Sequence, residues 1–141
     1  ISNLVAWKDG QGDIRRLQIL RSHVGDRLHW IGGAGDDLVP AYYGIGIRAF
    51  TSSVANVSAK IAWQLHETAS KGDVAALAPL MSTFVVPLYV LRAKRRGYEV
   101  SVMKSLMDLL GLAGGPVRPP LANLRAEEVD MLRAGLAAWR G

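Results

Sequence analysis

The chain has 141 residues, of which 50% are hydrophobic and 21% charged, a composition that favours a packed domain and excludes wholesale disorder. The absence of cysteine excludes disulfides, thiolate metal sites and a cysteine nucleophile, and the three scattered histidines predict no metal cluster. The net charge of +5 favours anionic partners.

Three strand–loop–helix units follow one another in residues 1–72. We expect Asp13 to cap the first helix, Gly25 to end it, and Asn56 to cap the third helix. The alternation of short apolar runs with helical spacing predicts an α/β fold with a parallel sheet and helical crossovers. The predicted strands cover residues 4–7, 28–31 and 47–52, and the predicted helices cover residues 14–24, 38–45 and 57–70.

Residues 73–141 are predicted to be helical throughout and to complete the same domain. Pro87 lies within the first apolar repeat and should bend its helix, whereas the segment 114–120 (GGPVRPP) should form a rigid loop. The apolar positions at helical spacing are Leu77, Met81, Phe84, Leu88 and Leu91, then Val100, Met103, Leu106, Met107 and Leu110, and finally Val129, Leu132, Leu136 and Trp139.

The densest basic cluster consists of Arg92, Lys94, Arg95 and Arg96. We interpret it as the basic C-terminal end of a helix, favoured by the helix dipole, rather than as a nucleic-acid surface. Nucleic acid is therefore not an expected partner. No run approaches the roughly 18 uninterrupted apolar residues of a membrane span, so a membrane is not an expected partner either. Because the first residue is Ile1 and no signal-peptide pattern follows it, we expect the sequence to begin inside a larger protein.

Lys8 is the most informative candidate for chemistry, because it ends an apolar strand and opens a glycine-bearing loop. In parallel α/β folds, ligands bind at the carboxyl ends of the strands. A lysine desolvated there has a lowered pKa and can form a Schiff base with a carbonyl compound. The alternative is a lysine that merely leaves the strand for solvent.

Two further strand ends carry polar groups. The loop after the second strand contains Gly33, Gly35, Asp36 and Asp37, whose backbone amides and carboxylates are candidates for gripping a polyol or carboxylate substrate. The alternative is that Asp36 or Asp37 caps the next helix. The segment Thr51, Ser52 and Ser53 ends the third strand, where its hydroxyls either bind a carboxylate or pass a proton, or simply form a turn.

These motifs resemble the carboxyl half of the dihydrodipicolinate synthase / N-acetylneuraminate lyase family. The resemblance covers essentially the whole chain and rests on residues 3–13 (NLVAWKDGQGD), 35–37 (GDD), 52–57 (SSVANV) and 115–121 (GPVRPPL). Members of that family are (β/α)8-barrel class I lyases, so the resemblance implies the C-terminal part of a TIM barrel. Residues 1–72 would supply strands 6–8, and residues 73–141 would supply the C-terminal helices.

One branch of the family is most similar. The segment 91–104 (LRAKRRGYEVSVMK) resembles the R-x-R-x-x-G-Y-x-V-S-x-x-K stretch of 5-dehydro-4-deoxyglucarate dehydratases, and Lys8-Asp9-Gly10 also suits that branch. The chain departs from the branch at residues 33–37, where the dehydratases have a G-x-P-T-x-E loop. It departs again at Ser58, where they have a proline.

The resemblance implies that Lys8 is the catalytic Schiff-base lysine and that the two polar strand ends bind substrate. It implies a small 2-keto acid as substrate, no metal or organic cofactor, a homo-oligomer and a cytoplasmic location. The family's tyrosine proton relay and its carboxylate-binding hydroxyl motif lie on earlier strands, outside this sequence. The substrate-binding candidates are Gly33, Gly35, Asp36, Asp37, Thr51, Ser52 and Ser53.

The resulting hypothesis is a lyase that dehydrates and decarboxylates 5-dehydro-4-deoxyglucarate to 2,5-dioxopentanoate. One alternative within the family is pyruvate-dependent aldol chemistry of the dihydrodipicolinate synthase type. Another is a non-catalytic barrel remnant used for binding or assembly, which would expose sheet edges and apolar faces.

Overall fold

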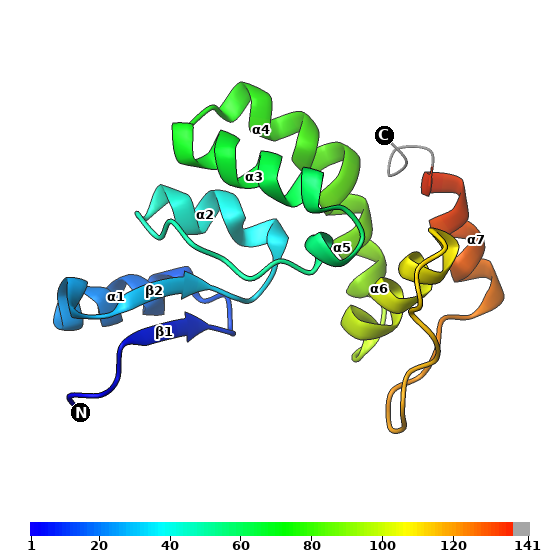
Figure 1. The fold of residues 1–141 in the computed structure, drawn as a ribbon, viewed down its shortest axis with the longest axis horizontal. Helices are drawn as coiled ribbons and strands as arrows, with labels where there is room; N and C mark the ends of the chain where they lie inside the picture. The colour runs from blue at the N-terminus through cyan, green and yellow to red at the C-terminus, as the bar shows by residue number, and fades with distance from the viewer. Residues whose placement is uncertain (137–141) are drawn as a thin grey trace.

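Two short parallel strands and a succession of helices make up the fold in a computed structural model that describes residues 1–136 (Figure 1). The first part contains β1 (Ala6–Asp9), α1 (Ile14–Val24), β2 (His29–Gly32), α2 (Val39–Gly44) and α3 (Ala59–Lys71). The second part contains α4 (Val74–Leu80), a π-helical turn (Met81–Val85), α5 (Val86–Arg92), α6 (Tyr98–Leu109) and α7 (Ala126–Gly135). Strands joined by helices confirm the predicted α/β class.

The sheet pairs β1 with β2 in parallel, with Lys8 opposite Ile31. The prediction of a third full strand over residues 47–52 is wrong in extent, because only an isolated parallel bridge joins Phe50 to Gly32. Two hydrogen bonds hold this segment beside β2: the Gly32 amide donates to the Ala49 carbonyl at 2.9 Å, and the Thr51 amide donates to the Gly32 carbonyl at 2.8 Å. Among the described residues the segment has a pairing partner on one side only, so no ladder extends along it.

The ends of the first helix are confirmed. The Asp13 carboxylate accepts a hydrogen bond from the Arg16 amide at 2.9 Å, and Gly25 ends α1 at a φ of 65°. These two residues therefore fix the length of the crossover between β1 and β2.

The expected caps of the other two helices are wrong. Ser58, not Asn56, caps α3, because its backbone is extended and its hydroxyl accepts from the Ile61 amide at 3.3 Å. Asn56 lies in a 3-10 turn, where its side-chain amide donates to the Ser53 carbonyl instead. Neither candidate aspartate caps α2, which follows Leu38 without a side-chain cap.

The apolar core runs through both parts of the chain. In the first part it is built from side chains of the strands and of the three helices, and in the second part from the inner faces of α4, α5 and α6. Its fully buried or nearly fully buried members include Leu17, Trp30, Val39, Tyr42, Ile47, Leu65, Leu77, Val85, Leu88, Leu91, Val102 and Leu106. The core therefore joins the sheet to the C-terminal helices.

A helical run extends from Val74 to Arg92 and contains the predicted irregularity at Pro87. The π-helical turn lies directly before this proline, where the ring removes a backbone donor and disfavours a regular turn. The expectation that no segment is long and apolar enough for a membrane span needs correction, because this 19-residue run passes on length and composition. Its inner face packs in the core, but only 22% of its apolar window is buried.

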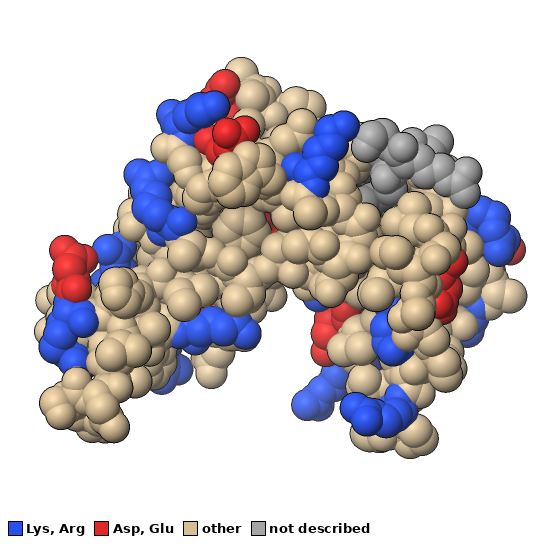
Figure 2. All heavy atoms as spheres, viewed as in Figure 1, with Lys and Arg blue, Asp and Glu red and all other residues tan. Residues whose placement is uncertain are grey.

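The basic cluster lies where the sequence predicts it, at the end of α5, with Lys94, Arg95 and Arg96 exposed in the turn that follows. Lys and Arg side chains are spread over the visible face rather than gathered in one patch (Figure 2). The predicted loop over 114–120 is confirmed, and α7 follows it. The predicted position Trp139 lies outside the described residues.

The buried carboxylate of Asp36 ties three segments together. It accepts hydrogen bonds from the Ser52 hydroxyl, from the Ser53 amide at 2.9 Å and from the Val54 amide at 3.2 Å. The Tyr89 hydroxyl on α5 lies 3.1 Å from the same carboxylate and accepts from the Asp36 amide at 2.6 Å. One side chain thus joins the loop after β2 to the third sheet segment and to the C-terminal helices.

Replacing Asp36 by alanine should destabilise the fold by about 3 kcal/mol, because buried amide donors lose their acceptor. The matched control is Asp37→Ala. Asp37 is half-buried and its carboxylate is hydrogen-bonded by the amides of its own turn, so this change should cost less than about 1 kcal/mol. Denaturant unfolding of the complete protein that carries this chain measures both, and equal losses would contradict the role given to Asp36.

A second buried carboxylate, Glu128, attaches α7. It accepts from the Tyr98 hydroxyl at 2.6 Å, from the Arg125 amide at 3.0 Å and from the Arg125 guanidinium at 3.0 Å. The Arg125 side chain, followed by the Tyr98 hydroxyl, lowers the pKa of the Glu128 carboxyl from 4.5 to about 2. The charged form is therefore the one that the folded helix binds.

This shift predicts a pH-dependent contribution to stability. Because the folded pKa of Glu128 lies below the unfolded value, its contribution is complete above about pH 4.5 and disappears as the pH falls towards 2. Thermal unfolding should show Glu128→Gln less stable than the unmodified protein at about pH 6, with the difference shrinking at about pH 3. The exposed neighbour provides the control, since Glu127→Gln should show no such convergence.

Candidate active site

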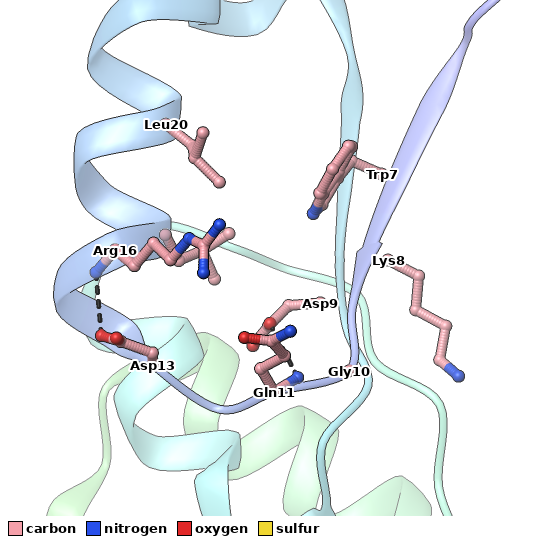
Figure 3. A pocket seen from close by; sticks show the side chains of 9 residues that line it. Trp7, Lys8, Asp9, Gly10, Gln11, Asp13, Arg16 and Leu20 are labelled. Carbon is pink, nitrogen blue, oxygen red and sulfur yellow. Dashed lines mark hydrogen bonds between the residues drawn. The ribbon is translucent and has the colours of Figure 1, made fainter.

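Lys8 is the penultimate residue of β1, so it lies within the strand rather than after it. Successive strand residues point to opposite faces, and Figure 3 shows the Trp7 ring turned towards α1 while the Lys8 side chain points away from it. The hollow between β1 and α1 is lined by residues that include Trp7, Lys8 and Arg16, and the Lys8 side chain points away from α1 (Figure 3). The amine is exposed on the other face of the sheet.

Gly33 provides the surface against which the Lys8 side chain lies. A Cβ atom at Gly33 would fall 2.3 Å from Lys8 Cε, 2.6 Å from Lys8 Cγ and 2.6 Å from the Asp9 carbonyl oxygen. No side chain fits there without displacing the lysine. The structure thus brings the predicted residues Lys8 and Gly33 into contact.

The predicted residues of the third segment reach the same edge of the sheet, but they face different surroundings. The Thr51 amide binds the Gly32 carbonyl, which places Thr51 beside the glycine loop with its side chain exposed. The Ser52 hydroxyl is occupied, because it donates to the Asp36 carboxylate and accepts from the Ala55 amide at 2.9 Å. The Ser53 amide also binds Asp36. Thr51 therefore has the most accessible hydroxyl of the three.

Gly35 and the two aspartates lie further from Lys8, against α5. Gly35 packs on Tyr89, since a Cβ atom there would lie 2.7 Å from the ring and 2.8 Å from the hydroxyl. Asp36 is fully buried with its carboxylate occupied, so the structure gives it a structural role, and substrate contact by Asp36 stays a prediction. Burial raises the pKa of the Asp37 carboxyl, and the Arg92 guanidinium opposes this shift.

Arg92 belongs to this site, although the sequence predicts only a basic helix end. Its guanidinium lies 4.2 Å from the centroid of the Tyr89 ring, an arrangement typical of a cation–π contact. Its Nε and Nη1 atoms are buried and make no hydrogen bond within residues 1–136. The chain therefore places a positive charge behind the loop that carries Asp37.

Sequence reasoning also missed the pair that holds the end of β1. The Asp9 carboxylate accepts from the amides of Gln11 and Gly12, each at 3.1 Å, and from the Tyr42 hydroxyl at 2.7 Å. Asp9 is visible in the sequence as the acidic residue after Lys8. Tyr42 carries no such signal, because it looks like any apolar residue on the inner face of a helix.

The arrangement offers an amine for carbonyl chemistry. The Lys8 amine lies near a strand end beside glycine backbone, and a lysine amine condenses with carbonyl groups once it is deprotonated. Within residues 1–136, no group of three His, Asp or Glu side chains is placed to hold a metal ion.

Comparisons with known proteins show the family of the chain. The sequence model of the Dihydrodipicolinate synthetase family matches residues 1–139. A probable 5-dehydro-4-deoxyglucarate dehydratase of Rhizobium meliloti (strain 1021) is 34% identical over 140 residues, covering 98% of this chain and 46% of the relative. A probable 5-dehydro-4-deoxyglucarate dehydratase of Pseudomonas putida (strain GB-1) is 36% identical over 134 residues, covering 94% of this chain and 44% of the relative.

Solved structures show the same fold. Dihydrodipicolinate synthase from Bacillus clausii matches with a TM-score of 0.89 at 26% identity, covering all of this chain and 48% of that one. Proteus mirabilis N-acetylneuraminate lyase matches with a TM-score of 0.80 at 26% identity, covering 99% of this chain and 46% of that one. The chain thus spans about half the length of the relatives that it matches. On the match over 139 residues, this chain belongs to the dihydrodipicolinate synthetase family.

Proposed function

We propose that this chain carries the nucleophile of a class I lyase, with Lys8 forming a Schiff base with a small 2-keto acid. The observation that carries the proposal is the position of Lys8 at the carboxyl end of β1, with its side chain against Gly33. Parallel α/β folds bind ligands at that end of the strands. Membership of the family supports the lyase class.

The proposed reaction is dehydration and decarboxylation of 5-dehydro-4-deoxyglucarate, supported by the names of relatives that are 34–36% identical. The Lys8 amine attacks the ketone carbon, and water leaves to give an iminium. Loss of a proton from the neighbouring CH2 carbon puts the electron pair into an enamine, which expels the hydroxyl group of the next carbon as water. The remaining hydroxyl-bearing carbon tautomerises to a ketone. The carboxylate on the iminium carbon then leaves as CO2, and the electron pair of the broken bond stays on that carbon, which takes up a proton. Hydrolysis releases 2,5-dioxopentanoate and the free amine.

In the complete protein we propose that residues 1–72 form strands 6–8 of a (β/α)8 barrel and that residues 73–141 form its C-terminal helices. A whole barrel of this kind needs about 250 residues, and this chain covers about half of its relatives. Lys8 is exposed in the described chain, so desolvation of its amine has to come from the remaining strands. The division at residue 72, the homo-oligomer and the cytoplasmic location stay predictions.

Pyruvate-dependent aldol chemistry is the second candidate. It is favoured by the structural likeness to a dihydrodipicolinate synthase and an N-acetylneuraminate lyase. The loop over residues 33–37 also departs from the dehydratase pattern, and that loop would face the distal end of the substrate. Both candidates use the same lysine and differ in the keto acid that it accepts.

Borohydride trapping followed by intact-mass measurement tests the proposal on the complete protein that carries this chain. We expect 5-dehydro-4-deoxyglucarate to give a reduced adduct with the unmodified protein and none with Lys8→Ala. Lys104→Ala is the matched control, since Lys104 lies on α6 outside the site, and it should keep the adduct.

The identity of the keto acid that gives an adduct distinguishes the dehydratase reaction from pyruvate-dependent aldol chemistry. An adduct with pyruvate alone would overturn the dehydratase proposal and favour aldol chemistry. No adduct with either compound, from folded protein, would overturn the Schiff-base mechanism for both and favour a non-catalytic role.

A further inference from the structure

We propose that Asp9 and Tyr42 are positioning residues for Lys8, which together clamp the end of β1 to the glycine loop against which the lysine side chain lies. The inference rests on the proposed role of Lys8 as the nucleophile. It assigns a function to two buried polar groups that the reaction itself does not use, and it rests on contacts among β1, the loop after β2 and α2.

Asp9 fixes the backbone on the carboxyl side of Lys8. The residue is buried, and its two carboxylate oxygens each accept one amide of the following turn, from Gln11 and from Gly12, at 3.1 Å. Carboxylates bound by backbone amides form charge-assisted hydrogen bonds, which are stronger than neutral ones. The turn that leaves the strand is therefore held directly after Lys8.

Tyr42 fixes the surface under the Lys8 side chain. Its ring packs against Gly32, where a Cβ atom would lie only 2.4 Å from the ring. Its hydroxyl donates to Asp9 at 2.7 Å and accepts from the Ala34 amide at 3.2 Å. The residues on either side of Gly33 are thus both held by one tyrosine, which is itself fully buried in α2.

Asp9 and Tyr42 restrict different parts of Lys8, namely its backbone and its side chain. Asp9 sets the strand from which the side chain leaves, and Gly33 limits the path of its stem, since Lys8 Cγ and Cε both lie against that glycine. The Asp9–Tyr42 hydrogen bond couples the two. Holding a reacting group in one geometry contributes to catalysis by lowering the entropy that the reaction has to lose, so a displaced amine reacts more slowly even when substrate still binds.

The protonation state of the pair suits this role. Burial, together with the hydrogen bond to the Asp9 carboxylate, raises the pKa of the Tyr42 hydroxyl to about 12. The Tyr42 hydroxyl therefore keeps its proton, and can donate it to Asp9, at pH values well below 12.

Adjacent tyrosines provide a matched test. Tyr42→Phe keeps the ring against Gly32 and removes only the hydroxyl, whereas Tyr43→Phe removes the hydroxyl of a neighbour that is also buried in α2. The Tyr43 hydroxyl donates to the Arg48 carbonyl at 3.1 Å and pairs with His66 Nδ1, away from Lys8. Both variants should lose some stability, but only Tyr42→Phe should affect the chemistry.

The measurement is the rate of borohydride-trapped adduct formation in the complete protein, as a function of the concentration of the keto acid that the unmodified protein traps. For Tyr42→Phe we expect the maximal rate to fall about 10-fold or more, with the half-saturating concentration changed less than about twofold. Tyr43→Phe should keep both values. Thermal unfolding of each variant confirms that the rates come from folded protein.

Asp9→Asn is the second variant and decides the question if Tyr42→Phe does not fold. The NH2 group that it introduces replaces either the oxygen that accepts from the Gln11 amide or the oxygen that accepts from the Gly12 amide and the Tyr42 hydroxyl. The maximal rate should therefore fall at least as far. Unchanged maximal rates in both folded variants, or an equal loss in Tyr43→Phe, would overturn the inference. Absence of an adduct in the unmodified protein would instead overturn the proposed function, so the two failures are distinguishable.

Discussion

The buried carboxylate of Asp36 is the interaction on which the arrangement of the chain depends. It lies on the loop after β2 and accepts hydrogen bonds from the third sheet segment and from Tyr89 of α5. A buried charge is tolerated only when its hydrogen bonds are complete, so the three segments can adopt few alternative positions without leaving it unpaired. The sheet segment, which has only two hydrogen bonds to β2, owes its place to this carboxylate.

A second carboxylate performs the corresponding task beside the candidate nucleophile. Asp9 organises the end of β1, and its bond to Tyr42 connects that end to the glycine loop. Asp36 therefore places the loops relative to the C-terminal helices, while Asp9 places Lys8 relative to the loops. Both residues act through backbone amides and hydroxyls, and Lys8 and Thr51 are themselves exposed.

The elements were largely predictable, because apolar spacing and local caps such as Asp13 and Gly25 act over a few residues. The third strand was overestimated, since strand formation depends on neighbours that a periodic pattern does not reveal. Lys8 and Gly33 lie in contact, and their roles in a site stay predictions. Tyr42, Tyr89 and Arg92 were missed because their contacts join segments far apart in the sequence, and a buried tyrosine hydroxyl leaves no trace in an apolar pattern.

Peptide mapping by tandem mass spectrometry of the borohydride-reduced adduct tests the central claim most directly, because it identifies which lysine carries the substrate. The complete protein would be trapped with 5-dehydro-4-deoxyglucarate, digested and compared with an untreated sample. We predict that the added mass lies on Lys8 and that Lys60, Lys71, Lys94 and Lys104 stay unmodified. An adduct on any other lysine, with Lys8 unmodified, would contradict the assignment of Lys8 as the nucleophile.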